Sequence, residues 1–133
     1  MTAPHIHPII VYYEDTDMAG LVYYANYLRY IERARSTIVE ELGVDQNAMR
    51  AEGLVFAIRR VEADYIGAAR LGDRLEVVTT HWSESPVRWM FRQEVQRDSA
   101  VIFKADVTAV CMTTAGKPTR LPAKIRALVH NSG

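Results

Sequence analysis

Residues 24–42, YANYLRYIERARSTIVEEL, contain the long helical pattern around which the rest of the chain is organised. Apolar or large side chains recur every three or four positions, and at roughly 100° per residue they fall within one narrow arc of a helix. These side chains are Tyr27, Ile31, Ala34, Ile38 and Leu42. Gly43 follows directly and suits the left-handed residue that ends many helices. The pattern predicts one amphipathic helix from about residue 24 to residue 42.

Arg35 interrupts the apolar side of this helix. It projects between Leu28 and Val39, inside the apolar sector. A guanidinium in such a position must be paired or must reach the edge of the apolar surface. We therefore expect an acidic partner in the loop before the helix, with Asp15 or Glu14 as candidates.

The remaining segments favour strands. Residues 101–113 alternate most cleanly, with apolar side chains on one face and Lys104, Asp106 and Thr108 on the other. In residues 87–96, Val87, Trp89, Phe91 and Val95 share one face. The predicted strands are residues 7–13, 54–66, 74–82, 87–96 and 101–113, with a short helical turn within 45–53.

This order of elements limits the architecture. A lone amphipathic helix and an antiparallel sheet each need a cover for an apolar face. A curled antiparallel five-stranded sheet wrapped around the one long helix satisfies both, which is an α+β fold. Such a sheet keeps open edges, so we expect two protomers to pair.

The composition excludes several classes of partner. The chain of 133 residues suits a single domain, 1–133, and Lys plus Arg equal Asp plus Glu at 16 each, which does not favour nucleic acid or an anionic membrane. No apolar run approaches the roughly 20 residues of an integral membrane segment, and the N-terminus does not resemble a signal peptide. Cys111 is the single cysteine, which fits a reducing compartment, and we expect the cytoplasm and no metal site.

The acidic loop before the helix is the unusual feature. Glu14, Asp15 and Asp17 lie just upstream of a helix N-terminus, where free N–H groups can stabilise a developing oxyanion. A carboxylate beside such a site can attack an acyl group or activate a water molecule. Asp15 and Asp17 also suit a purely structural role as turn formers or helix caps, and the residues alone do not decide between the two interpretations.

The stretch VYYEDTDMAGLVYYANYLRYIERAR, residues 11–35, resembles the signature of the 4-hydroxybenzoyl-CoA thioesterase-like family. More closely, it is similar to the acyl-CoA thioesterases associated with the Tol–Pal system. DYIGAARLGDRLEV at 64–77 and GKPTRLP at 116–122 extend the likeness over nearly the whole chain. The resemblance implies a hot-dog fold, hydrolysis of acyl-CoA esters, and active sites at the interface of a homodimer or homotetramer.

The same resemblance implies roles for individual residues. The family's catalytic Asp precedes two spacers and a Gly, which is the position of Asp17, acting as nucleophile or as general base. The oxyanion and substrate-binding region then comprises Gly20, Tyr24, Ala25 and Asn26. Tyr24 stands where the Tol–Pal-type members commonly carry His, so a His-assisted step is not expected there.

Coenzyme A enters as part of the substrate, and no separate cofactor is expected. Its phosphates call for basic residues at the mouth of the site, for which Arg88, Lys117 and Arg120 are the candidates. Three alternatives remain open: action on acyl-carrier-protein thioesters, a hot-dog dehydratase, and a non-catalytic acyl-CoA-binding or scaffold protein. A dehydratase usually needs a catalytic His near the helix, and the sequence has none there.

Overall fold

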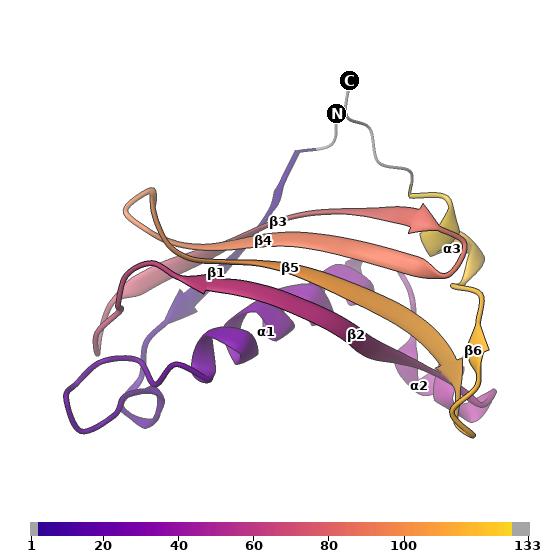
Figure 1. The fold of residues 1–133 in the computed structure, drawn as a ribbon, viewed down its shortest axis with the longest axis horizontal. Coiled ribbons are helices and arrows are strands. Elements are labelled where there is room, and N and C mark those ends of the chain that lie inside the picture. The colour runs from indigo at the N-terminus through magenta and orange to yellow at the C-terminus, as the bar shows by residue number, and fades with distance from the viewer. Residues whose placement is uncertain (1–2, 129–133) are drawn as a thin grey trace.

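A computed structural model describes residues 3–128. The predicted order of strand, long helix and four strands is confirmed, and the fold is the hot-dog arrangement (Figure 1). The elements are β1 (His5–Ile10), η1 (Tyr13–Asp15), α1 (Asn26–Glu41), α2 (Gln46–Ala51), β2 (Leu54–Tyr65), β3 (Arg74–Ser85), β4 (Arg88–Arg97), β5 (Ala100–Thr113), β6 (Pro118–Thr119) and α3 (Ala123–Arg126).

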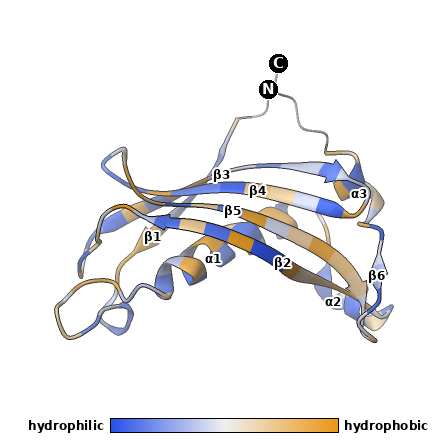
Figure 2. Ribbon diagram, viewed as in Figure 1, coloured by the Kyte–Doolittle hydropathy of each residue, from blue (hydrophilic) through white to orange (hydrophobic). Residues whose placement is uncertain are grey.

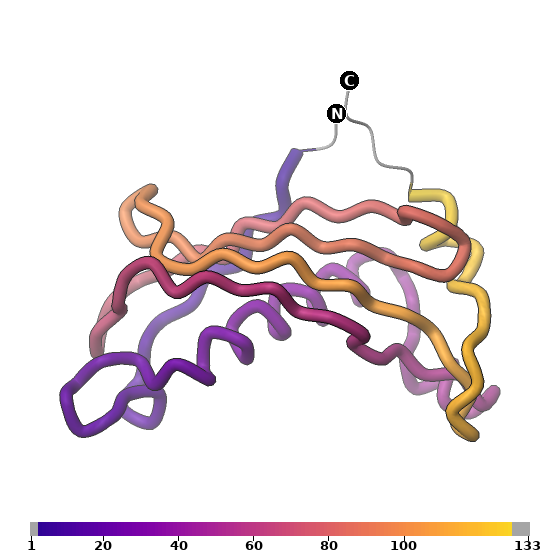
Figure 3. The backbone as a smooth tube through the Cα atoms, in the orientation of Figure 1, coloured from indigo at the N-terminus to yellow at the C-terminus, as the bar shows by residue number. Residues whose placement is uncertain are grey.

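One antiparallel sheet contains all the strands. Its order is β1-β3-β4-β5-β2, and the two-residue strand β6 pairs with β5. The sheet arches over α1, which lies along its concave face, as the tube in Figure 3 shows. The contacts of α1 with the sheet are mainly with β1, β3 and β4, so the edge strand β2 receives little cover from the helix.

The structure of α1 confirms the amphipathic helix that the sequence periodicity predicts. The predicted apolar positions are buried except Leu42, which is half-buried and caps the C-terminal end. Gly43 has a φ of +76°, the left-handed conformation expected after a helix. The apolar side of α1 faces the sheet, since its buried residues belong to one core cluster with those of the strands. Figure 2 shows that hydrophobic and hydrophilic residues both occur along the helix.

The alternation along β4 and β5 also holds for the concave face. Trp89, Phe91 and Val95 are buried on β4, and five side chains of β5 are buried beside them. Those of β5 are Phe103, Ala105, Val107, Ala109 and Cys111. Val87 was wrongly placed on this face, because the chain turns before Arg88 and leaves Val87 exposed.

The largest local difference from the prediction lies at the start of the chain. β1 ends at Ile10, and Tyr13–Asp15 form a 3₁₀ turn instead of continuing the strand. The turn is held by the Tyr12 N–H, which donates to Oδ2 of Asp15 over 2.9 Å. The β-branched and aromatic composition of residues 7–13 therefore predicted too long a strand. A side-chain hydrogen bond competes with strand pairing at this point of the chain.

The prediction of an acidic partner for Arg35 is wrong within this chain. Nη1 of Arg35 donates to Oε1 of Gln93 over 3.0 Å, and among residues 3–128 neither Asp15 nor Glu14 pairs with it. The amide of Gln93 is held in turn by donating to the Ile31 carbonyl and the Thr79 hydroxyl. Burial lowers the pKa of Arg35, an effect that the Glu32 carboxylate opposes.

Tyr27 ties α1 to the loop before β3. Its buried hydroxyl accepts a hydrogen bond of 2.9 Å from the N–H of Ala69, which is also buried. Tyr27→Phe leaves that N–H without its acceptor, and we expect a loss of about 1–3 kcal/mol in the free energy of unfolding. Urea titration measures it, with the exposed Tyr13→Phe as a control expected to change little. Equal effects of the two substitutions would contradict the assignment.

Candidate active site

The loop between η1 and α1 is a compact turn that presents Asp17. The N–H of Asp17 donates to the Leu21 carbonyl over 2.8 Å, and the N–H of Gly20 donates to the Asp17 carbonyl over 3.0 Å. Gly20 has a φ of +76°, which side chains other than Gly rarely adopt, so the turn itself requires Gly here. Asp17 therefore lies at the start of a short turn that backbone hydrogen bonds hold in place.

The carboxylate of Asp17 is both oriented and accessible. Its Oδ1 accepts hydrogen bonds from the N–H groups of Ala19 over 2.9 Å and Leu21 over 3.2 Å. No residue within 3–128 donates to Oδ2, and the side chain is exposed. One oxygen is thus fixed by the loop while the other is free to act on a ligand.

Asp15 has the opposite environment. Its side chain is only 6% exposed, and its carboxylate accepts the Tyr12 N–H. Burial and the neighbouring Asp15 carboxylate raise the pKa of Tyr30. The structural interpretation therefore applies to Asp15, and Asp17 is the carboxylate of this loop that is available for chemistry.

Asn26 anchors the acidic loop to the start of α1. Its Nδ2 donates to the Asp15 carbonyl over 2.8 Å, and the N–H of Tyr23 donates to the same carbonyl over 2.9 Å. Oδ1 of Asn26 accepts from Arg29, and the side chain is buried. The side-chain amide of Asn26 is therefore engaged within the fold, and its place in the substrate-binding region stays a prediction.

The backbone just before α1 offers unpaired donors. The N–H groups of Tyr23 and Asn26 have acceptors, whereas those of Tyr24 and Ala25 have none among residues 3–128. Ala25 already has helical dihedral angles and provides no side-chain cap. These two N–H groups lie at the positive end of the helix dipole, which is the arrangement that stabilises an oxyanion.

Aromatic rings form a wall beside this helix start. Tyr24 contacts the rings of Tyr23 and Tyr65, with centroids 4.9 and 6.1 Å away. Tyr65 also packs on Tyr27 and, at 4.9 Å, on Phe103. Sequence reasoning missed Tyr65, although its position at the end of β2, on the concave face, was the signal that could have identified it.

The geometry at Asp17 can be compared with known proteins. The model of a family described as the thioesterase-like superfamily matches residues 11–129. The chain belongs to this superfamily. A free carboxylate beside a helix N-terminus suits a thioesterase, since both features serve acyl transfer.

Relatives of this thioesterase-like chain extend over nearly its whole length. The acyl-CoA thioester hydrolase YbgC of Escherichia coli is 37% identical over 122 residues, covering 90% of this chain and 91% of that protein. The acyl-CoA thioesterase YbgC of Haemophilus influenzae is 35% identical, covering 93% of each. A 1,4-dihydroxy-2-naphthoyl-CoA thioesterase structure from Synechocystis has a TM-score of 0.85 at 23% identity, covering 91% of each chain, and supports the fold. The chain is a thioester hydrolase of this superfamily.

The basic candidates of this thioesterase lie at the far end of the sheet. Figure 1 shows the loop before α1 at one end and the β3–β4 turn at the other, beside β6. The strand register pairs Tyr65 with Phe103 and Trp89 with Ala109, so Trp89 lies about 20 Å along β5 from Tyr65, and Arg88 lies one residue further. Within one chain, Asp17 and Arg88 are therefore not brought together.

A cavity does form around Arg88. It has a volume of about 340 Å³ and an apolar floor that includes Val110 and Met112, and Arg59 also lines it. Lys117 and Arg120 are exposed in the segments flanking β6, next to this cavity. Arg59 was not predicted, and its position after Ile58 at the β-bulge explains why strand alternation did not reveal it.

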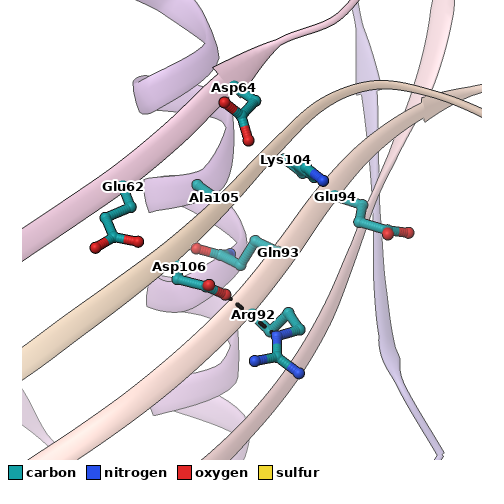
Figure 4. A pocket seen from close by; sticks show the side chains of 8 residues that line it. All are labelled: Glu62, Asp64, Arg92, Gln93, Glu94, Lys104, Ala105 and Asp106. Carbon is teal, nitrogen blue, oxygen red and sulfur yellow. Dashed lines mark hydrogen bonds and ion pairs between the residues drawn. The ribbon is translucent and has the colours of Figure 1, made fainter.

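The convex face of the sheet carries a cavity of different chemistry. Figure 4 shows the carboxylates of Glu62, Asp64 and Asp106 around it, with Arg92 paired to Asp106 at 3.2 Å. Its volume is about 360 Å³. Acidic side chains outnumber basic ones along its walls, so this cavity is a poor match for the phosphates of coenzyme A.

Two further findings concern the part of the chain that the structure describes. Among residues 3–128, no group of three or more His, Cys, Asp or Glu side chains is arranged to hold a metal ion. No helix in the described range is long and apolar enough to span a membrane.

Proposed function

We propose that this chain hydrolyses acyl-CoA thioesters, with Asp17 as the catalytic carboxylate. One observation carries the proposal: the free Oδ2 of Asp17 belongs to the same short loop that leads to the unpaired N–H groups of Tyr24 and Ala25. The names of the YbgC relatives support coenzyme A as the leaving group. The cytoplasm remains the expected location.

Two routes use this geometry equally well. As a general base, Asp17 takes a proton from water, and the hydroxide attacks the thioester carbonyl carbon. As a nucleophile, its carboxylate attacks the same carbon and forms a mixed anhydride, which water then hydrolyses. In both, the N–H groups of Tyr24 and Ala25 donate to the carbonyl oxygen as its negative charge grows. When the tetrahedral intermediate collapses, the C–S bond breaks and the thiolate of coenzyme A leaves and takes up a proton. In the general-base route this collapse yields the free acid, and in the nucleophilic route it yields the mixed anhydride before water hydrolyses it.

The aromatic wall is the natural neighbour of the acyl group. The Tyr24 and Tyr65 rings adjoin the donors and are both partly exposed, so an acyl chain or ring can pack against them. Gly20 keeps the opposite side of the loop open, since no atom lies within 4 Å of the position that a Cβ would take. Aromatic and short aliphatic acyl groups both fit this description.

A homodimer would bring the phosphate-binding candidates Arg88, Lys117 and Arg120 of one copy close to the Asp17 loop of the other. β2 is an edge strand whose other side is unpaired, and a two-fold axis beside it pairs two copies antiparallel. Such an axis reverses the ends of the sheet, so the Arg88 end of one copy approaches the Asp17 end of the other. Tetramer formation through the convex faces is compatible with this dimer.

Arg88 is expected to act on coenzyme A recognition rather than on bond cleavage. Losing a charge-assisted contact to a phosphate weakens binding by roughly tenfold, so Arg88→Met should raise KM by about that factor and leave kcat nearly unchanged. An acyl ester of N-acetylcysteamine, which lacks the phosphates, should show no change. Arg50→Met, an exposed Arg on α2, is the matched control. Equal KM values for wild type and Arg88→Met with coenzyme A esters would remove Arg88 from the site.

The alternative functions differ in what they release. Rates of thiol release from matched acyl-CoA and acyl-carrier-protein esters test the leaving group, and we expect coenzyme A esters to give the higher kcat/KM. A preference for the carrier protein would favour the alternative thioesterase. Conversion of a β-hydroxyacyl ester to its enoyl ester without thiol release would instead identify a dehydratase.

A further inference from the structure

Arg35 is a half-buried cation that forms no ion pair among residues 3–128, although the Glu32 carboxylate on the same helix lies close enough to raise its pKa. Its guanidinium lies half-buried over the Phe91 ring, 6.0 Å from the centroid, and uses one donor on the neutral amide of Gln93. No Asp or Glu among residues 3–128 lies within ion-pair distance of it. Because Gln93 is itself held by two hydrogen bonds, it fixes the guanidinium in place and leaves its other N–H donors free.

These free donors border an open groove. A cavity of about 240 Å³ lies between α1 and the β2 side of the sheet, and Arg35 lines it together with Phe56, Ile58 and Trp89. The groove continues along the concave face of β2, where apolar side chains remain uncovered. Ile58 is 47% exposed, Val61 41% and Tyr65 46%. Apolar strand residues left this open on a concave face are typical of an interface.

A second copy of the chain can cover this groove, which Arg35 lines together with Glu32. Antiparallel pairing of β2 with its copy covers the open edge and turns the second copy end for end. The loop before α1 lies at the Tyr65 end of β2, where Tyr24 contacts Tyr65, whereas the groove lies near Phe56 at the start of β2. Antiparallel pairing of two β2 strands therefore brings the loop of the second copy toward the groove of the first. The loop carries the exposed Asp17, whose Oδ2 has no donor within residues 3–128.

We propose that Arg35 of one copy donates to the carboxylate of Asp17 of the second copy. This inference rests on the proposed function. Arg35 is then a positioning residue: it holds the charged Asp17 carboxylate toward the N–H groups of Tyr24 and Ala25 in the second copy. The pairing also gives the half-buried guanidinium the close ion pair that it does not form among residues 3–128 of a single chain.

Single substitutions of Arg35 test whether this residue contributes to the rate of hydrolysis. Arg35→Met removes a charge-assisted hydrogen bond but keeps an apolar side chain in the groove, and we expect kcat to fall about tenfold to a hundredfold. Arg35→Lys keeps the charge and should recover part of the rate. Arg33→Met changes an exposed Arg on the same helix and should leave the rate near that of wild type. If Arg35→Met fails to fold, Arg35→Gln takes its place.

A mixed dimer tests whether the Asp17 and Arg35 that act together belong to one chain or to two. Co-expression of Asp17→Asn and Arg35→Met chains with different affinity tags yields dimers with one copy of each. If Asp17 and Arg35 meet across the interface, one site of the mixed dimer carries both native residues and restores about half of the wild-type activity. If the two residues act within one chain, both sites stay defective and the mixed dimer is as inactive as its parents, which overturns the inference. Full activity of the Asp17→Asn homodimer would instead overturn the proposed function.

Discussion

Asp17→Asn is expected to lower kcat for thioester hydrolysis at least about a hundredfold. The amide is nearly isosteric, and its oxygen can accept the N–H groups of Ala19 and Leu21 as Oδ1 of Asp17 does. The loop should therefore keep its shape. What is lost is the negative charge on the free oxygen, which both a nucleophile and a general base require. Steady-state thiol release on the preferred ester measures the effect.

Glu14→Gln is the matched control for this substitution. Glu14 is an exposed carboxylate in the same acidic segment, three residues away, and has no hydrogen-bond role among the described residues. We expect the kcat of Glu14→Gln to stay within about twofold of wild type. The melting temperatures of Glu14→Gln and Asp17→Asn should both equal that of wild type. Similar losses in both variants would point to the general charge of the loop and against a specific role for Asp17.

Phe103→Ala is expected to have the largest effect on stability, about 3–5 kcal/mol in the free energy of unfolding. Phe103 is fully buried on β5 and stacks on Tyr27 of α1 with centroids 5.2 Å apart. It also contacts Tyr65 of β2, so one ring joins the helix and two strands. Its removal leaves a cavity where the helix start is fixed to the sheet.

Two companion variants separate this cavity from local effects. Phe103→Leu fills most of the volume and should lose less than half as much stability, about 1–2 kcal/mol. Lys104→Ala, at the next and exposed position, should change the free energy by less than about 0.5 kcal/mol. Urea unfolding of the three variants measures how much free energy of unfolding each one loses. A loss below about 1 kcal/mol for Phe103→Ala would mean that the aromatic cluster does not hold α1 to the sheet.

The parts of the fold that were predictable have strong periodicity. The helix predicted for residues 24–42 is found at Asn26–Glu41, and the strand predicted for 101–113 at Ala100–Thr113. Both segments bury one face only, so their side chains repeat with the period of the element. The acidic loop was recognisable as a candidate site from its composition and its position before a helix, but only the family resemblance singled out Asp17 within it.

The parts that were missed depend on contacts between distant segments. The two-residue strand β6 forms only because β5 extends far enough to pair with it at Cys111 and Met112. The partner of Arg35 is Gln93, which lies 58 positions away and whose own bonds to Ile31 and Thr79 exist only in the folded sheet. No local pattern marks such partners. The separation of Arg88 from Asp17 likewise follows from strand direction, which spacing along the chain does not encode.

The most direct test of the central claim is simultaneous measurement of free thiol and free acid from an acyl-CoA ester incubated with the wild-type protein. We expect both products to appear in equal amounts, over many turnovers and without added metal or cofactor. Tight binding of the ester with neither product released above the uncatalysed rate would contradict it, and would identify the chain as an acyl-CoA-binding protein on a thioesterase fold.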